Sequence, residues 1–218
     1  MFEKIKLLFL MITLMLLAGC AVGQSVIDIA PDVSKTSQPA PSSDGKSVYI
    51  NSVNDKRVFE VDPPIPETPS LDPSEASSDS IKQRAIGRKR GGFGKAFGNI
   101  LLKEDESITG LMTSAIRQAF IDKGYAVLDK PEQVMPDTYV VDAEISKFWA
   151  WMNPGFFAIT LSAEISTDMS IKSGEKTQKL TVQVKSAGKF QTGMKSNYIE
   201  VISNAIKLYV DDLKNKLQ

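Results

Sequence analysis

The feature that most constrains this fold is a regular alternation of apolar and polar side chains along three successive segments, residues 138–152, 156–171 and 177–190. A period of two predicts β-strands with one buried and one solvent-facing side, because successive side chains of a strand point to opposite faces of the sheet. Turn sequences at residues 153–155 and 173–174 separate the segments. We therefore expect an antiparallel meander of three strands.

The lengths of the two turns predict how these strands pair. The expected cross-strand pairs are Ile165 with Val182, Asp168 with Lys179, Met152 with Phe156, and Glu144 with Glu164. A slip of one residue would bury the lysines, so the register is well specified. Trp149 and Trp151 share the phase of the buried face, and we expect both in the core.

Two segments carry apolar residues at intervals of three and four, which predicts amphipathic helices over residues 105–123 and 197–213. Asn197, with Glu200 three residues later, resembles a capping box. Residues 47–53 and 125–128 read as further strands. Together these elements predict an α+β fold, a two-layer sandwich in which a mostly antiparallel sheet of about four to five strands carries both helices on one face.

The N-terminus has the organisation of an export signal. Lys4 and Lys6 precede the apolar run Leu7–Ala18, which is too short to span a bilayer, since about 20 residues are needed. Leu17-Ala18-Gly19-Cys20 resembles the bacterial lipobox, and Cys20 is the single cysteine of the chain. We expect residues 1–19 to be a lipoprotein signal peptide and Cys20 to carry a diacylglyceryl group and an N-acyl chain. The alternative is an ordinary secretory signal with an incidental cysteine.

Composition then divides the remaining chain. Residues 20–46 are expected to form a flexible tether, and residues 47–218 a single periplasmic domain. Eight of the eleven prolines lie between Pro31 and Pro73. The Pro-rich, acidic stretch at about 60–82 is therefore expected to be a mobile, disordered insertion without ladders or helices. Ala21 follows the cysteine, whereas an aspartate there resembles an inner-membrane retention signal, so the expected location is the outer membrane, facing the periplasm.

The absence of histidine excludes Ser-His-Asp and Cys-His catalysis and histidine metal sites. One cysteine excludes an internal disulfide and a Cys-rich metal site. With 26 basic and 26 acidic residues there is no overall basic field for nucleic acid. Glu144 and Glu164 could form an acid–base dyad, but a solvated pair on an open sheet face is the favoured interpretation. We expect no enzyme activity, no metal and no cofactor beyond the acyl chains on Cys20.

Two segments are candidates for contact with a partner. The Gly-rich segment 86–102 fits neither a Walker A loop nor a dinucleotide-binding fingerprint. Its basic residues would meet anionic lipid headgroups or an acidic partner, namely Arg88, Lys89, Arg90 and Lys95, and Phe93 and Phe97 would add apolar anchoring. The alternative is a flexible loop whose phenylalanines pack on the sheet edge.

The second candidate is an apolar patch that falls out of phase on the polar sheet face. Its members are Phe148, Met152 and Phe156. Large apolar groups gathered on a solvent-facing side are typical of docking surfaces. The alternative is that the Pro-rich or the Gly-rich segment folds over them.

Four features resemble the YajG-like lipoproteins of Gram-negative bacteria. They are the lipobox, the strand and turn VYINSVNDKR (Val48–Arg57), the helix ending in Lys123-Gly124-Tyr125, and the meander followed by a C-terminal helix. The segments GRKRGGFGKAFGNILL and FWAWMNPGFFAI are also similar to those of proteobacterial lipoproteins with a flagellar-biosynthesis label. The resemblance implies no enzyme activity and no defined ligand.

The sequence predicts an outer-membrane-anchored periplasmic lipoprotein that acts as a binding or assembly adaptor for an envelope complex. A complex related to the flagellum is one candidate. The alternative is a lipid or glycan carrier or sensor at the inner leaflet of the outer membrane. The membrane, through the lipid anchor, and an envelope protein complex are the expected partners.

Overall fold

The computed structural model describes residues 23–29, 45–61, 63–91 and 95–217. Cys20, the predicted signal peptide and Phe93 lie outside these ranges. The elements, in chain order, are β1 (Ser25–Ile27), β2 (Ser47–Asp55), β3 (Glu60–Val61), β4 (Ser70–Leu71), α2 (Asp79–Lys82), β5 (Ala85–Arg90), β6 (Ala96–Leu102), α3 (Ile108–Asp122), β7 (Ala126–Leu128), the 3-10 turn η3 (Pro131–Gln133), β8 (Tyr139–Asn153), β9 (Ile159–Ser173), β10 (Lys176–Phe190) and α4 (Lys195–Lys216).

The fold is α+β, but the expected sheet of four to five mostly antiparallel strands was wrong. The described residues form an eight-stranded mixed sheet and a separate two-stranded ladder of β3 and β4. One edge of the long strand β8 pairs antiparallel with β9, which pairs with β10. The other edge pairs in parallel with β2 and then with β5. Strands β6 and β1 extend the sheet beyond β5, and β7 extends it beyond β2.

The extra strands come from segments that composition marked as a loop and as a tether. Their glycines are places of close backbone approach rather than of flexibility. A Cβ on Gly87 would lie 2.7 Å from the carbonyl oxygen of Ala150 on β8, and a Cβ on Gly98 would lie 1.4 Å from that of Gly23. Only glycine allows the backbones to meet at this distance. The Gly-rich segment therefore forms the hairpin of β5 and β6, and β6 receives β1.

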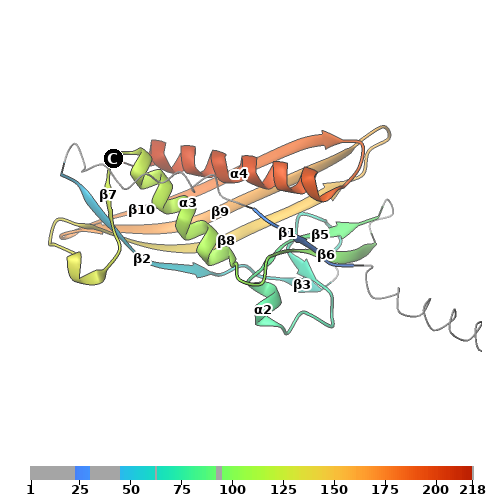
Figure 1. The fold of residues 1–218 in the computed structure, drawn as a ribbon, viewed down its shortest axis with the longest axis horizontal. Helices are drawn as coiled ribbons and strands as arrows, with labels where there is room; N and C mark the ends of the chain where they lie inside the picture. Colours follow the sequence, from blue (N-terminus) through green and yellow to red (C-terminus); the bar gives the residue numbers. More distant parts are fainter. Residues whose placement is uncertain (1–22, 30–44, 62, 92–94, 218) are drawn as a thin grey trace, which may run out of the picture.

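Helices α3 and α4 cover one face of the sheet, as expected (Figure 1). The Ser107 side chain accepts a hydrogen bond from the backbone N–H of Gly110 (3.1 Å) and caps α3. The cap of α4 lies earlier than the predicted capping box. Met194 is the N-cap, and the side chain of Asn197 accepts from the Met194 N–H (3.2 Å).

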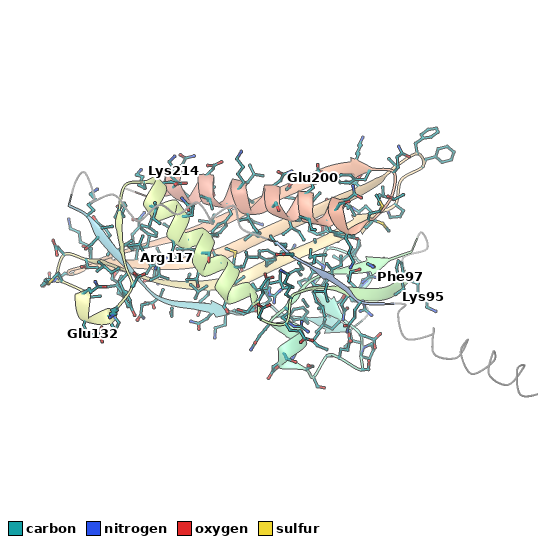
Figure 2. The ribbon with its side chains drawn as sticks, in the orientation of Figure 1. Lys95, Phe97, Arg117, Glu132, Glu200 and Lys214 are labelled. Atoms are coloured by element: carbon teal, nitrogen blue, oxygen red, sulfur yellow. The ribbon has the colours of Figure 1, made fainter. Side chains whose placement is uncertain are left out.

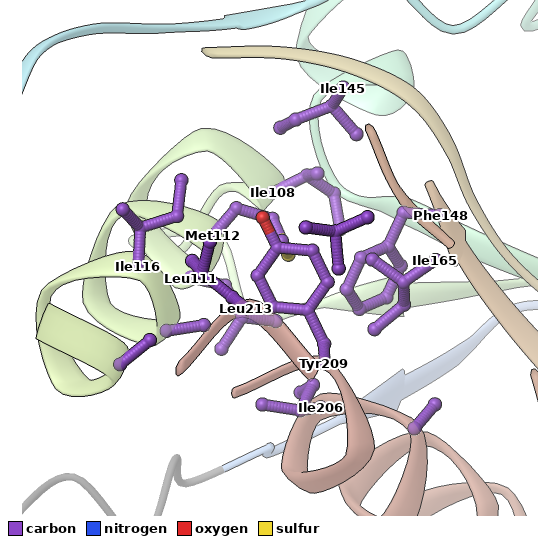
Figure 3. Packing of buried hydrophobic residues seen from close by; sticks show 14 of the residues in the cluster. Ile108, Leu111, Met112, Ile116, Ile145, Phe148, Ile165, Ile206, Tyr209 and Leu213 are labelled. Carbon is purple, nitrogen blue, oxygen red and sulfur yellow. The ribbon is translucent and has the colours of Figure 1, made fainter. Parts of the chain in front are cut away.

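The main core lies between the helices and the sheet, and Figure 3 shows its centre. Tyr209 of α4 lies there among Ile145 and Phe148 of β8 and Ile165 of β9, all at most 1% exposed. Met112 and Ile116 of α3 complete the contact from the other helix. Burial of large apolar side chains from these four elements stabilises the packing of both helices on the sheet.

A β-bulge between Ile145 and Lys147 changes which face the later residues of β8 occupy. One extra residue in a strand reverses the alternation beyond it. Phe148 consequently joins the core beneath the helices, whereas Trp149 and Trp151 belong to a second cluster on the other sheet face. The prediction that Phe148 forms part of an exposed docking patch is therefore wrong, since its side chain is 1% exposed.

The predicted registers were also wrong, although the phases of β9 and β10 hold. Ile165 lies opposite Val184 and Asp168 opposite Thr181, a slip of two residues along β10. Such a slip preserves which face each side chain occupies. On β8, Met152 lies opposite Leu161 rather than Phe156. The β8–β9 loop is longer than the expected three residues and spans residues 154–158.

The Pro-rich segment covers the second cluster. Its composition predicted no ladder or helix, which is wrong for β3, β4 and α2. Leu71 is fully buried beside Trp149 and Trp151, and Phe59 meets Trp149 edge-on with ring centroids 6.0 Å apart. The Trp149 indole N–H donates to the carbonyl oxygen of Pro66 (3.2 Å). One end of the sheet face expected to be solvated is therefore a small apolar core.

A buried arginine joins the turn after β2 to the sheet. Asp55 and Arg57 form a salt bridge, with Nη2 of Arg57 at 2.7 Å from the Asp55 carboxylate. The same guanidinium donates to the carbonyl oxygens of Ala85 (2.6 Å), Lys82 (2.7 Å) and Phe148 (3.1 Å). Arg57 therefore positions the end of α2 and the start of β5 against β8.

Candidate functional site

A pocket of about 800 Å³ lies where the Pro-rich segment, the β5–β6 hairpin and the end of β8 meet. We call it the Pro-Arg pocket. Four prolines line it, Pro63, Pro64, Pro66 and Pro73, together with the basic residues Arg88, Arg90 and Lys95. Met152 and Asn153 contribute from β8. Residues far apart in the sequence are thus brought together by the packing of the Pro-rich segment over Trp149.

Arg88 is the most enclosed charged group of this pocket, at 6% exposure. Its Nη1 donates to the carbonyl oxygen of Leu71 (2.7 Å), and its Nη2 lies 3.7 Å from the carboxylate of Asp72. Its Nε is buried without a hydrogen-bond partner among the described residues. A buried donor left without an acceptor is uncommon in proteins and calls for a physical explanation.

The carboxylate of Asp72 makes only a long ion pair with Arg88. Asp72 is half exposed. Hydrogen bonds from the side chain and the backbone N–H of Ser74, and then the charge of Arg88, hold the pKa of Asp72 below its usual value. The guanidinium thus has one long ion pair and one carbonyl contact, which leaves donor capacity for an incoming anion.

The three consecutive basic residues predicted to act together do not share one site. Arg90 lines the Pro-Arg pocket near the carbonyl oxygen of Pro63 (3.5 Å), and Lys95 lies at its exposed rim. Lys89 instead lies near the start of α4. Partial burial and the charge of Lys195 lower the pKa of Lys89. Alternation along β5 explains this division.

The predicted apolar patch is likewise dispersed. Phe148 is in the main core, Met152 is half-buried at the Pro-Arg pocket, and Phe156 is 94% exposed at the β8–β9 tip. Phe157, the next residue of the same loop, is 85% exposed, and the rings of Phe156 and Phe157 meet edge-on with centroids 4.7 Å apart. Sequence reasoning missed Phe157 and the proline wall, because neither follows from alternation.

The carboxylates considered for acid–base chemistry also lie apart. Glu144 lies opposite Asp168, whereas Glu164 lies opposite Trp149. Glu164 accepts hydrogen bonds from Lys147 (2.8 Å) and Gln183 (2.7 Å). Burial by itself would raise the pKa of Glu164, but the two hydrogen bonds have a larger combined effect, and the pKa is lowered.

A second hollow of about 650 Å³ lies on the sheet face opposite the helices, away from the Pro-rich segment. Asp142, Glu144, Asp168 and Lys179 line it. The Asp142 carboxylate is held by the side chains of Asn51 and Ser52, both at 2.7 Å. Within the described ranges, no group of three or more histidine, cysteine, aspartate or glutamate residues is placed to hold a metal ion.

The chemistry available in the Pro-Arg pocket is recognition of an anion. Guanidinium and ammonium groups donate hydrogen bonds and accept none, and they favour carboxylate or phosphate oxygens. The proline rings add a stiff apolar wall beside these donors. Its volume lies within the range of ligand sites.

No helix in the described part of the chain is long and apolar enough to cross a membrane.

No protein-family model matches the chain, and no curated protein sequence matches it. Among solved structures, it is similar to an uncharacterised protein at 10% identity and a TM-score of 0.42, over 79% of this chain and 99% of the other. It is also similar to a minor lipoprotein from Acinetobacter baumannii at 8% identity and a TM-score of 0.33, over 50% and 86% of the two chains. A hypothetical protein from Chlamydia trachomatis matches at 12% identity and a TM-score of 0.30, over 77% and 97%.

Proposed function

We propose that this protein is a lipid-anchored periplasmic adaptor of the outer membrane, which holds an acidic segment of an envelope protein in the Pro-Arg pocket. The observation that carries the proposal is the guanidinium of Arg88, which lines the pocket beside Arg90 and Lys95 and makes one carbonyl hydrogen bond and one long ion pair. A carboxylate of a partner lying in the pocket would give this guanidinium a further acceptor.

The lipobox supports the anchored location. Cys20 follows Leu17-Ala18-Gly19 at the end of the apolar run, and Ala21 follows it. Several acyl chains on one cysteine hold a protein at a membrane far more firmly than a single chain does. The domain would then act where it is held, as an adaptor rather than as a freely diffusing enzyme.

The shape of the pocket favours a peptide as the ligand. Prolines 63, 64, 66 and 73 present rigid rings that lose little conformational entropy when a chain lies against them. Arg90 and Lys95 stand along the same pocket as Arg88, so successive carboxylates of an acidic segment would each meet a cation. Bidentate pairing with arginine adds directional specificity.

Photo-crosslinking in living cells tests this proposal. The probe, a photoreactive phenylalanine analogue, replaces Asn153, an exposed residue of the pocket wall, and a control probe replaces the exposed Glu132 of η3. We expect a protein adduct at position 153 but not at 132, with an acidic peptide as the crosslinked segment. Lipid adducts without a protein adduct, or no adduct at all, would overturn the adaptor.

Charge reversal separates specific capture from chance capture. Arg90→Glu with Lys95→Glu should abolish the adduct at position 153. Lys176→Glu with Lys207→Glu changes the net charge equally at two exposed lysines outside the pocket and should leave the adduct unchanged. Equal loss in both double variants would show that capture depends on overall charge, which contradicts a specific site.

A further inference from the structure

The described chain begins at a well-packed position close to the proposed lipid anchor. Gly23 lies beside β6, where its carbonyl oxygen would be 1.4 Å from a Cβ on Gly98. Ser25–Ile27 then pair in parallel with Ile100–Leu102 of β6, and the side chains of Ser25 and Ile27 are buried. The chain is therefore held to the sheet from its first described residues, and the predicted flexible tether of residues 20–46 is interrupted by a strand.

Cys20 lies three positions before Gly23 in the sequence. An extended chain spans at most about 3.6 Å per residue, so the Cα atom of Cys20 lies within about 11 Å of that of Gly23. This step rests on the lipid anchoring in the proposed function. With Cys20 acylated, only this short stretch of chain joins the membrane to the surface of the domain around Gly23, rather than a long linker.

The exposed aromatic side chains of the described residues gather at this same end. They are Phe97 (50% exposed), Phe156 (94%) and Phe157 (85%). Figure 1 shows that the β8–β9 loop and the β5–β6 hairpin lie at one end of the long axis, and Figure 2 labels Lys95 and Phe97 there. Asn153 and Pro154, where the β8–β9 loop begins, line one pocket with Lys95.

Exposed lysines accompany these rings. Lys95 precedes β6, and Lys189 belongs to the last paired rows of β10, opposite Thr160. Lys195 begins α4 and lies near enough to Lys89 to lower the pKa of that amine, after the larger effect of burial. Basic side chains next to exposed aromatic rings suit an anionic phospholipid surface, because the rings enter the interface and the ammonium groups meet the headgroups.

We infer that this end is a membrane-docking face, in which Phe156 and Phe157 enter the interfacial region of the leaflet that holds the acyl chains of Cys20. We call it the Phe tip face. The anchor makes insertion an intramolecular event with a high effective concentration, so two rings are enough to bias the orientation. The opposite end, where Figure 2 labels Glu132, then points away from the membrane.

Site-specific fluorescence in vesicles tests the orientation. Because Cys20 is the only cysteine and its sulfur carries the lipid, Phe156→Cys supplies a single free thiol in the full-length lipidated protein. That thiol is labelled with the polarity-sensitive dye NBD, and the protein is reconstituted into phosphatidylethanolamine–phosphatidylglycerol vesicles containing brominated lipid. Glu132→Cys, labelled in the same way, is the control.

We expect the dye at position 156 to shift to the blue and to be quenched severalfold more by brominated lipid than the dye at 132. Equal quenching at both positions, in protein that floats with the vesicles, would overturn the docking face and leave the anchor intact. Protein that does not float, and whose Cys20 reacts with the dye, would overturn the anchor and with it this inference.

A second variant tests whether the rings themselves hold the face at the membrane. A dye at position 97 reports on the same face from a different element, because Phe97 is half exposed on β6. Replacing both Phe156 and Phe157 with serine should reduce quenching at position 97 by severalfold while flotation persists. Unchanged quenching would mean that the anchor alone sets the orientation. Both rings are exposed, so the fold tolerates this change.

Discussion

The hydroxyl groups of Thr167 and Tyr209 share a hydrogen bond of 2.8 Å between the middle of β9 and α4, and both residues are fully buried. Burial raises the pKa of Tyr209, so the phenol stays protonated. This bond is a polar contact within an otherwise apolar core, and it aligns α4 on the sheet.

A double-mutant cycle should detect this bond. Thr167→Val or Tyr209→Phe alone leaves one buried hydroxyl unpaired and should cost about 1–3 kcal/mol of unfolding free energy. The double variant should cost less than the sum of the two, since neither partner then remains unpaired. Urea unfolding measures all four proteins. Strictly additive losses would show that the two hydroxyls do not stabilise one another.

Replacing Gly98 with alanine should release β1. The new methyl group would collide with the carbonyl of Gly23, and the strand that buries Ile27 would leave β6. Losing the burial of one isoleucine costs about 1.5–3 kcal/mol. Hydrogen exchange should rise selectively over residues 23–29. Gly91→Ala is the control, because the nearest atoms to its Cβ would be 3.9 Å away. Equal protection in both variants would contradict the close packing of β1 on β6.

Removing the indole of Trp149 should loosen the Pro-rich segment as well as destabilise the fold. Trp149→Ala is expected to cost about 3–5 kcal/mol, because the ring is 1% exposed in the second cluster. Proteolysis should accelerate within residues 60–82, which pack on this ring. Phe157→Ala, at an exposed ring, should change the unfolding free energy by less than about 0.5 kcal/mol. Similar losses for the two variants would contradict the assigned positions.

The network around Glu164 should make stability depend on acid pH. Although burial raises the pKa of Glu164, hydrogen bonds from Lys147 and Gln183 leave it below the ordinary value of 4.5. A carboxyl with a lowered pKa in the folded state contributes stability that is fully present above the unfolded pKa and is lost as the pH falls through the folded pKa. We therefore expect the unfolding free energy of the wild type to decline below about pH 4.5.

Glu164→Gln should show a shallower decline between pH 6 and pH 3, because glutamine does not titrate. Glu132→Gln, at an exposed position outside the network, serves as the control. Denaturant titrations at several pH values measure the slope. Parallel curves for wild type and Glu164→Gln would show that Glu164 does not contribute to acid unfolding.

The positions of candidate site residues were predictable in part. Arg88, Arg90, Lys95 and Met152 were expected at a binding surface, and all four line the Pro-Arg pocket. Phe148 was misplaced because one bulge after Ile145 reverses the alternation, and no local signal marks a bulge in a polar stretch.

The sequence by itself determined the two long helices and the three strands of the meander, because apolar spacing reports which face of a helix or strand is buried. The α+β class, both long helices and the phases of β9 and β10 followed from residues close together in the chain. Tertiary structure alone decided the registers, since a slip of two residues preserves every face. It also decided that Gly87 and Gly98 belong to strands, because their role depends on Ala150 and Gly23, partners distant in sequence. The Pro-Arg pocket also depends on contacts between segments distant in sequence. The Pro-rich segment packs over Trp149, and this contact brings its prolines to Arg88.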